Sequence, residues 1–364
     1  MVLVGVFVAE VLVGGGLLLA CGSEFNRVED WTGMYVIGAD IGYNNVKVAH
    51  GDVSWGKPRL RVWPALAVPE RSVGMRFAHG EGDEDLSLRV WARGEPWLVG
   101  VDPSQVQGRN LRELHEDYTQ SDGWEAMLAA ALSCAGRSNV DLLVVGMPVS
   151  QYHEAGRRDR LKERLVGSFQ VSEGRWVSVK RVEVLPQPGG AMADYAWRGG
   201  GSMVWDGRVV VVDPGYYSFD WAVFSGGVYR NEVSGTGHEA MSRIVEGVAK
   251  ELGRLRGVAQ VSPERVEQAL RAGRGRVLVA GEWVNLELPL GEVSARVVGG
   301  ALSRMRSVLR DEDEQPDLVL VVGGGARCYE GALRAAYPAS HVEVAPEPVL
   351  ANVRGYWGRG CGFV

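Results

Sequence analysis

Cysteine is scarce in this chain of 364 residues and never forms a motif. The four cysteines lie far apart in the sequence, none belongs to a CxxC pair, and the six histidines are scattered singly. This pattern excludes a disulfide framework and gives no sign of a zinc site. We therefore expect a protein of a reducing, cytoplasmic compartment.

Positive charge is also in short supply. The formal net charge is −6, the longest basic run is the short GRRDR at 156–160, and only five of the 39 basic residues are lysine. Direct nucleic-acid binding needs a basic footprint, so we expect none. Because lysine is rare here, a lysine inside a motif carries more weight than usual.

Glycine is abundant but follows no period. The 50 glycines are about twice the usual share, which is roughly 7%, without a G-X-Y repeat or a Gly/Ser tract. Collagen and a linker-rich chain are excluded, and we expect the glycines in turns and at close backbone approaches. A chain of this length predicts two domains with a sizeable core.

Residues 1–33 are predicted to be an extension outside the fold. Residues 1–21 form an apolar run interrupted by Glu10 and a GGG triplet, and no lysine or arginine precedes Arg27. A signal peptide would explain LLLAC but lacks its basic segment, and a membrane anchor would bury Glu10 at a cost of about 2.5 kcal/mol. We favour an upstream extension, from a misassigned start or from cloning, and expect no membrane association unless the segment is genuine.

From Tyr35 onward one pattern occurs twice. YVIGADIG predicts a strand that ends in DxG, followed by a YNN turn and the strand VKVAHG, which together form a hairpin. RVVVVDPG from Arg208, then YYS and FDWAVFSGG, repeat this order. Asp40 and Asp213 therefore hold matching places in two predicted hairpins.

Further matched elements follow each hairpin in the same order. DLLVVGMP from Asp141 and DLVLVVGGG from Asp317 predict buried parallel strands, after which Gly146 and Gly323 are paired. VEVLPQP at 182–188 and VEVAPEP at 342–348 each predict a strand, a turn and a small helix.

A repeat of this length predicts two related α/β domains rather than a solenoid. We assign residues 34–204 to domain I, closed by a C-terminal helix at 345–364, and residues 205–344 to domain II. Non-repeated pieces, including hairpins at 87–100 and 276–288, would lie between the matched elements.

The first hairpin has the residues of an anion site. Asp40 places a carboxylate at a tight turn whose amides, freed by Gly42 and tolerated by Asn44, can point at an anion, and Lys47 would add a cation for phosphate. Alone, DxG is more often a capped turn. The second copy, with Asp213, Gly215 and Ser218 in the matching places, favours a polyphosphate clamped from both sides, with the two aspartates holding Mg²⁺ through water.

Two other motifs extend this candidate site. GGGA at 323–326 follows a buried strand, and its glycines either let backbone lie against a ribose or adenine or simply form a strand-to-helix turn. Neither the Rossmann spacing nor a Walker A motif is present. Gln187, in PQP, could orient a water towards a terminal phosphate or merely cap a helix.

Taken together, these motifs resemble the actin-like ATPases of the actin/Hsp70/sugar-kinase superfamily, and within it the bacterial plasmid-segregation proteins of the ParM type. The resemblance covers residues 35–364 and rests on DIGYNNVK, GMPVS, VLPQPGGA, VVDPGYYSFDW, VVGGGA and ANVRGYW. It implies an actin-like fold, ribonuclease H-like and duplicated, with a nucleotide cleft between two domains. It further implies ATP and Mg²⁺, slow assembly-coupled hydrolysis, polar filaments and a DNA-binding adaptor protein.

The resemblance also assigns roles to residues. Asp40 would lie on the metal side, Asp213 would face Mg²⁺ and the phosphates, and Gln187 would orient the attacking water. The nucleotide-binding residues would be Gly42, Tyr43, Asn44, Lys47, Asp213, Gly215, Tyr216, Ser218, Gly323, Gly324 and Gly325. Tyr43, Tyr216 and Tyr217 depart from the small residues usual at these turns.

Two other functions stay open at this point. A small-molecule kinase of the same superfold would need an acceptor pocket with a catalytic aspartate in domain I, and the sequence shows no signature of one. A nucleotide-gated binding protein with little turnover would use the same motifs without fast chemistry. The leading hypothesis is a cytoskeletal actin-like ATPase that segregates or positions plasmid DNA.

Overall fold

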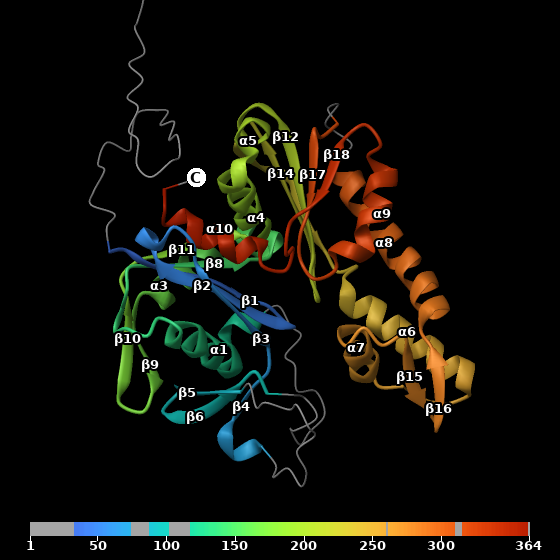
Figure 1. The fold of residues 1–364 in the computed structure, drawn as a ribbon, viewed down its shortest axis with the longest axis horizontal. Helices are drawn as coiled ribbons and strands as arrows, with labels where there is room; N and C mark the ends of the chain where they lie inside the picture. The colour runs from blue at the N-terminus through green and yellow to red at the C-terminus, as the bar shows by residue number, and fades with distance from the viewer. Residues whose placement is uncertain (1–32, 74–86, 102–116, 260, 310–314, 363–364) are drawn as a thin grey trace, which may run out of the picture. The chain divides into compact units, whose positions relative to one another are not determined.

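The structure is a computed structural model that describes residues 33–73, 87–101, 117–259, 261–309 and 315–362 (Figure 1). These residues belong to one unit, Gly33–Val364. The predicted extension at 1–33 therefore lies, apart from Gly33, outside the described residues.

A five-stranded sheet in the order β11-β8-β1-β2-β3 forms the centre of what we call the first lobe. Its strands are β1 Tyr35–Ile41, β2 Asn45–Asp52, β3 Arg59–Pro64, β8 Leu142–Met147 and β11 Val182–Pro186. β1 and β2 form the predicted antiparallel hairpin, and β8 runs parallel to β1 as predicted.

The second lobe contains the same sheet again, in the order β14-β13-β12-β17-β18. Its strands are β12 Arg208–Pro214, β13 Phe219–Ser225, β14 Val228–Gly237, β17 Leu318–Val321 and β18 His341–Val344. Read from the other edge, this order matches the first sheet strand for strand, and the pairing directions of the hairpin and the parallel strands also match. The predicted duplication is therefore confirmed.

Equivalent aspartates precede the inner parallel strands of both sheets. The Asp141 carboxylate accepts the backbone N–H of Tyr35 at 2.8 Å, and the Asp317 carboxylate accepts that of Arg208 at 2.7 Å. Both bonds begin the ladder between the hairpin strand and its parallel neighbour. Each aspartate thus fixes the register in its own lobe.

One detail of the predicted repeat is wrong. Val36 pairs with Leu142 and Val209 pairs with Leu318, so the register places Val322 opposite Gly146 in the superposed repeat. Gly323 lies one residue further on. The first glycine after each of the two matched strands is therefore not at an equivalent position. The role of Gly323 depends on its own surroundings.

Ten helices join and cover the two sheets in the described part of the chain. They are α1 Asp122–Ser133, α2 Val149–His153, α3 Arg157–Leu165, α4 Gln187–Tyr195, α5 Gly201–Asp206, α6 Met241–Arg256, α7 Pro263–Arg271, α8 Glu287–Leu309, α9 Ala326–Ala336 and α10 Ala351–Arg359. Local sequence sets several ends. Ser121 caps α1 by accepting the Trp124 N–H, and Gly257 ends α6 in the left-handed conformation.

Smaller sheets fill the non-repeated stretches. The predicted hairpins at 87–100 and 276–288 are present as β5 with β6 and as β15 with β16. The strands of these sheets are β4 Ala67–Pro69, β5 Leu88–Ala92, β6 Glu95–Val99, β7 Asn139–Val140, β9 Gly167–Ser172, β10 Arg175–Val179, β15 Arg276–Val279 and β16 Glu282–Asn285.

The inner strands β1, β8, β12 and β17 are buried on both faces of their sheets, as their apolar runs predict. In β12, Val209 and Val211 pack in one hydrophobic cluster while Val210 and Val212 pack in another. In the first lobe, a cluster on one face of β1 includes the fully buried Tyr356 and Trp357 of the C-terminal helix α10. These aromatic residues therefore belong to the core of the first lobe.

Helices α4 and α10 cross in very close contact. A Cβ at Gly355 would overlap the carbonyl of Gly190, so glycine is required there. Beside this contact, Arg354 of α10 donates to both carboxylate oxygens of the fully buried Asp194 of α4, at 2.9 and 2.8 Å. The pair fixes α10, which follows the last strand of the second lobe, against a helix that follows the last strand of the first.

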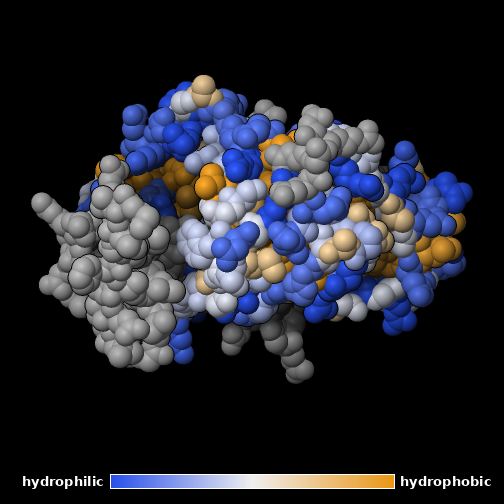
Figure 2. Space-filling view, turned by 90° about the horizontal axis from the view of Figure 1, so that it is seen from above, coloured by the Kyte–Doolittle hydropathy of each residue, from blue (hydrophilic) through white to orange (hydrophobic). Residues whose placement is uncertain are grey.

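The surface is a mosaic. On the face drawn in Figure 2, hydrophilic side chains alternate with small hydrophobic patches. Exposed large apolar residues come from several elements, among them Trp176, Trp205, Trp283 and Leu288, and single residues of this kind are normal on soluble domains. No helix in the described ranges combines the length and the hydropathy needed to cross a membrane.

Candidate functional site

The turns of the two hairpins line one cavity of about 450 Å³. In each turn a glycine N–H donates to the carbonyl three residues later, Gly42 to Asn45 at 3.2 Å and Gly215 to Ser218 at 2.9 Å. The cavity therefore has the same backbone device on two of its walls. Eleven of the predicted site residues line it: Asp40, Gly42, Tyr43, Asn44, Lys47, Gln187, Asp213, Gly215, Tyr216, Ser218 and Gly324.

Two predicted residues, Gly323 and Gly325, do not line the cavity. They lie directly behind it. A Cβ at Gly323 would overlap the Asp213 carboxylate, and Gly323 has a φ of 78°. Gly325 donates its N–H to the Pro214 carbonyl at 2.9 Å. The GGG segment thus packs against the end of β12, and only its middle residue reaches the cavity wall.

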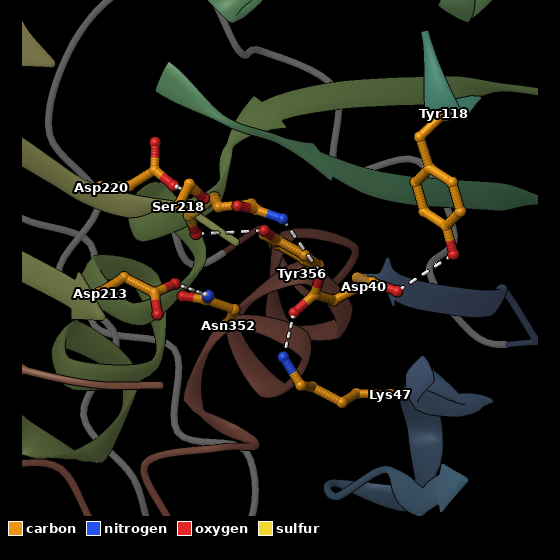
Figure 3. Close-up of polar contacts among 10 residues, drawn as sticks. Asp40, Lys47, Tyr118, Asp213, Ser218, Asp220, Asn352 and Tyr356 are labelled. Atoms are coloured by element: carbon orange, nitrogen blue, oxygen red, sulfur yellow. Dashed lines mark hydrogen bonds and ion pairs between the residues drawn. The ribbon is translucent and has the colours of Figure 1, made fainter. Parts of the chain in front are cut away.

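Asp40 is buried beside the turn of the first hairpin, between the ammonium group of Lys47 and the side-chain amide of Gln187. Lys47 Nζ lies 2.7 Å from Asp40 Oδ2 (Figure 3). Gln187 Nε2 donates to Asp40 Oδ1 at 3.2 Å. Burial alone would lower the pKa of Lys47, but the carboxylates of Asp40 and Asp213 raise it above its ordinary value. Lys47 therefore stays charged, and Gln187 is held by Asp40 at the start of α4.

Asp213 occupies the equivalent place in the second hairpin with different partners. Asn352 of α10 donates from Nδ2 to Asp213 Oδ2 at 2.7 Å (Figure 3). Burial raises the pKa of Asp213 to about 6, against the lowering effect of Lys47. A cation bound beside Asp213 would stabilise its ionised form and so lower this raised pKa. The Asp213 carboxylate therefore favours the binding of a cation.

Sequence reasoning missed Asp220, the second carboxylate of the second hairpin. Asp220 is 1% exposed and lines the cavity. Its Oδ2 accepts the Ser218 hydroxyl at 2.6 Å, and its Oδ1 accepts the Thr236 hydroxyl at 2.5 Å and the Val149 N–H at 2.9 Å. Burial nevertheless raises its pKa. Since Val149 begins α2 of the first lobe, Asp220 connects the two lobes.

The repeat itself contained the signal for Asp220. In the first hairpin Asp40 pairs with Lys47, seven residues later, and in the second Asp213 pairs with Asp220, also seven residues later. A residue-by-residue alignment of the two copies would have marked this position. The duplication therefore places a lysine and an aspartate at equivalent points of one cavity.

A second group missed by sequence reasoning forms an apolar wall with two charges. Its apolar members come from α6, α7 and their neighbours in the second lobe: Met241, Val245, Leu270, Leu290 and Cys328. Beside them, Glu267 accepts the Tyr216 hydroxyl at 3.1 Å and forms an ion pair with Arg271 at 2.7 Å. Apolar walls with a few placed polar groups are typical of pockets for small organic ligands.

The cavity suits a metal ion that arrives with a ligand. Among the described residues, its walls hold four carboxylates, Asp40, Asp213, Asp220 and Glu267, and two cationic side chains, Lys47 and Arg271. In the described part of the chain no cluster of three or more His, Cys, Asp or Glu could hold a metal alone. Mg²⁺ typically uses one or two carboxylates together with water and phosphate oxygens, and Asp40 and Asp213 meet that requirement.

Comparison with known families gives two matches along the chain. Residues 38–190 match the family model of the actin-like proteins' N-terminal domain, and residues 211–335 match that of the C-terminal domain of the archaeal MreB-like actin homologue. The first match lies in the first lobe and the second match in the second lobe, and together they span most of the described chain. No curated protein matches the sequence.

Solved structures match over nearly the whole chain. An archaeal actin homologue, Ta0583, is 20% identical, with a TM-score of 0.72 over 91% of this chain and all of its own; another structure of it holds ADP. A ParM subunit from a 15-stranded filament of Clostridium botulinum is 17% identical, with a TM-score of 0.69 over 91% of this chain and 99% of its own. A non-polymerisable ParM mutant of pCBH is 18% identical, with a TM-score of 0.69 over 90% of this chain and 99% of its own. The fold predicted from the sequence is confirmed.

Proposed function

The chain belongs to the actin-like proteins, and from this premise we propose that it binds ATP with Mg²⁺ between its lobes, hydrolyses it slowly and assembles into polar filaments. The observation that carries the proposal is the pair of equivalent hairpins, each with an aspartate at its end, on two walls of one cavity. Amides at tight turns bind anions, and two such turns suit a chain of phosphates.

Residues from both hairpins and from α4 would contact the nucleotide, the metal ion and the attacking water. Lys47 and the turn amides of Tyr43 to Asn44 and of Tyr216 to Ser218 would hold the phosphates, while the N–H groups of Gly42 and Gly215 close the turns themselves. Asp40 and Asp213 would hold Mg²⁺ through its water ligands, and that ion would neutralise charge on the phosphates. Gln187, kept in place by its 3.2 Å bond to Asp40, would orient the attacking water without serving as a strong base.

The base and sugar of the nucleotide would use the second lobe. The apolar wall of Met241, Val245 and Leu270 offers a surface for a flat ring, and Gly324 lies at the edge of the same cavity. Glu267 is placed to accept a hydrogen bond from a sugar hydroxyl or a base amino group. Gly323 and Gly325 would act indirectly, by allowing the close packing behind Asp213.

Filament assembly is supported by the relatives, among which a ParM filament and a non-polymerisable ParM mutant are described. A polar filament requires a heterologous interface that does not close. With such assembly, the chain would segregate or position plasmid DNA in the cytoplasm through a DNA-binding adaptor protein, since its net charge of −6 disfavours direct contact with DNA.

Light scattering of the purified full chain after addition of Mg²⁺ and ATP tests this function. We expect scattering to rise with ATP and fall as phosphate is released. Asp213→Ala should abolish the rise, whereas Asp206→Ala, which removes an exposed carboxylate outside the cavity, should leave it intact. A flat trace for the unaltered chain at every concentration up to about a hundred micromolar, a range in which weak protein contacts form, would remove the filament proposal.

A second cavity supports one alternative. It measures about 480 Å³, shares Tyr43 and Tyr118 with the first, and has Asp122 on its wall. Its volume is sufficient for the acceptor of a small-molecule kinase. However, the Asp122 side chain is 60% exposed and lies 3.4 Å from Arg93, which makes it a poor buried base. ATP turnover stimulated by a sugar or an acid would favour this alternative over the filament-forming ATPase.

A further inference from the structure

The tips of the two hairpins touch each other through aromatic rings. The ring centroids of Tyr43 and Tyr217 are 4.4 Å apart, with an interplanar angle of 36°. On its other side Tyr43 stacks on Tyr118 at 4.6 Å and 25°. Tyr217 also meets His238 edge to face at 5.7 Å. A continuous row of four rings thus crosses from the first lobe to the second.

A polar bridge crosses beside the ring row. Arg271, at the C-terminal end of α7 in the second lobe, donates to the side-chain oxygen of Asn44 in the first hairpin turn, and its guanidinium is 3.5 Å from the Asn44 carbonyl. Glu267, one turn earlier on the same helix, pairs with Arg271 at 2.7 Å. The adjacent residues Tyr43 and Asn44 are therefore both attached to the opposite lobe.

All of these bridging residues line the same cavity except His238. We propose that the Tyr43–Tyr217 ring contact and the Asn44–Arg271 bond form a latch that joins the two hairpin turns and controls how fast a nucleotide enters and leaves. The inference rests on the proposed function for its ligand, but the latch itself is a property of the protein without nucleotide.

The latch is attached to the same two turns that would hold the phosphates. The turn amides that would hold phosphate belong to the residues whose side chains form the latch, so the lobes cannot separate at the phosphate end without breaking it. Aromatic rings in contact attract each other beyond the effect of the apolar area that they bury, and this attraction is lost once the rings part. A bound nucleotide would therefore be released through opening of the latch, and a weaker latch should speed both entry and exit.

The release rate of a fluorescent ADP derivative, measured by stopped-flow chase with unlabelled nucleotide, tests the proposal. Tyr217→Leu removes the ring and should speed release about two- to tenfold, the range that aromatic pair energies allow. Tyr217→Phe keeps the ring and should release at the rate of the unaltered chain. Arg271→Gln should also speed release, while Arg265→Gln, exposed on the same helix and outside the cavity, should not.

A double variant identifies the partner. If Tyr43 and Tyr217 act through each other, Tyr43→Leu combined with Tyr217→Leu should release no faster than the faster single variant. Multiplying effects would mean that the two rings act separately, and equal release rates for Tyr217→Leu and Tyr217→Phe would overturn the ring latch.

Hydrogen exchange of the nucleotide-free chain separates this proposal from the proposed function. Amides of the two turns, 42–45 and 215–218, should exchange faster in Tyr217→Leu than in Tyr217→Phe, while the strand amides of β1 and β12 stay protected in both. Unchanged exchange at the turns would overturn the latch even if nucleotide binds. Absence of any nucleotide binding, together with faster turn exchange, would instead refute only the proposed function.

Discussion

The two hairpins have the same backbone and opposite charges at one equivalent position. In both, an aspartate is the penultimate residue of the first strand and pairs across the hairpin with the residue seven positions later. That residue is Lys47 in the first lobe and Asp220 in the second. Duplication preserved the turn that points amides at the cavity, while the partner of the aspartate diverged.

This difference gives the two halves of the site different tasks. Asp40 is neutralised by Lys47 at 2.7 Å, so the first hairpin presents a cation and a fixed glutamine to the cavity. In the second hairpin Asp213 has a neutral partner, Asn352. Asp220 accepts three hydrogen bonds, one of them from Val149 of the first lobe. The first hairpin is therefore suited mainly to anions, with Asp40 meeting a metal ion only through water, and the second to a cation and to contact between the lobes.

The largest effect is expected from the replacement of Lys47, which holds the position equivalent to that of Asp220. Lys47→Met leaves Asp40 buried with only the Gln187 amide as a partner, and uncompensated buried charges destabilise by about 4 kcal/mol. Chemical denaturation should show this loss, and nucleotide binding should be lost as well. Asp40→Asn combined with Lys47→Met should recover most of the stability but not the binding. If Lys47→Met alone were as stable as the unaltered chain, the first hairpin would not depend on the ion pair.

The pH dependence of Asp213 is the next largest effect. Burial raises its pKa to about 6, so the folded state holds this proton more tightly than the unfolded state. Its contribution to stability is therefore full below pH 4 and falls as pH rises to about 6, by about 3 kcal/mol. The free energy of unfolding of Asp213→Asn should not fall in this way, because asparagine has no carboxyl group to titrate. Without nucleotide, the variant should gain stability relative to the unaltered chain between pH 4 and 7, and parallel pH profiles of the free energy of unfolding would contradict the assignment.

A smaller effect is expected at Asp220. Asp220→Ala removes the acceptor of the Ser218 and Thr236 hydroxyls and of the Val149 N–H, and unsatisfied buried donors cost about 2 kcal/mol. Asp220→Asn keeps an acceptor and should lose less. Thermal unfolding measures the two variants against each other. Equal melting temperatures for Asp220→Ala and Asp220→Asn would show that these hydrogen bonds do not stabilise the contact between the lobes.

The smallest effect compares the two turn glycines. A Cβ at Gly215 would lie 3.0 Å from the Ser218 carbonyl oxygen, and one at Gly42 would lie 3.3 Å from that of Asn45. Gly215→Ala should therefore cost about 1 kcal/mol and Gly42→Ala less. Denaturation of both variants under the same conditions checks the order, and a larger loss for Gly42→Ala would contradict the geometry.

Much of the fold was predictable because the strands are buried on both faces and repeat in order. The apolar runs of β8 and β17 predict buried parallel strands, and the repeated DxG turns after β1 and β12 predict equivalent hairpins in the two sheets. Contacts between the lobes were not predictable, because Asp220 with Val149 and Tyr43 with Tyr217 join residues far apart in sequence. The offset between Gly146 and Gly323 shows that glycine alone is a poor guide to strand register.

Isothermal titration of ATP into the full chain, with and without Mg²⁺, tests the central claim most directly. The account predicts one site per chain, binding that weakens at least tenfold without Mg²⁺, and no measurable heat with Lys47→Met or Asp213→Ala, whereas Asp206→Ala binds as the unaltered chain does. Binding that is independent of Mg²⁺ and unaffected by Lys47→Met and Asp213→Ala would contradict a nucleotide site between the two hairpins.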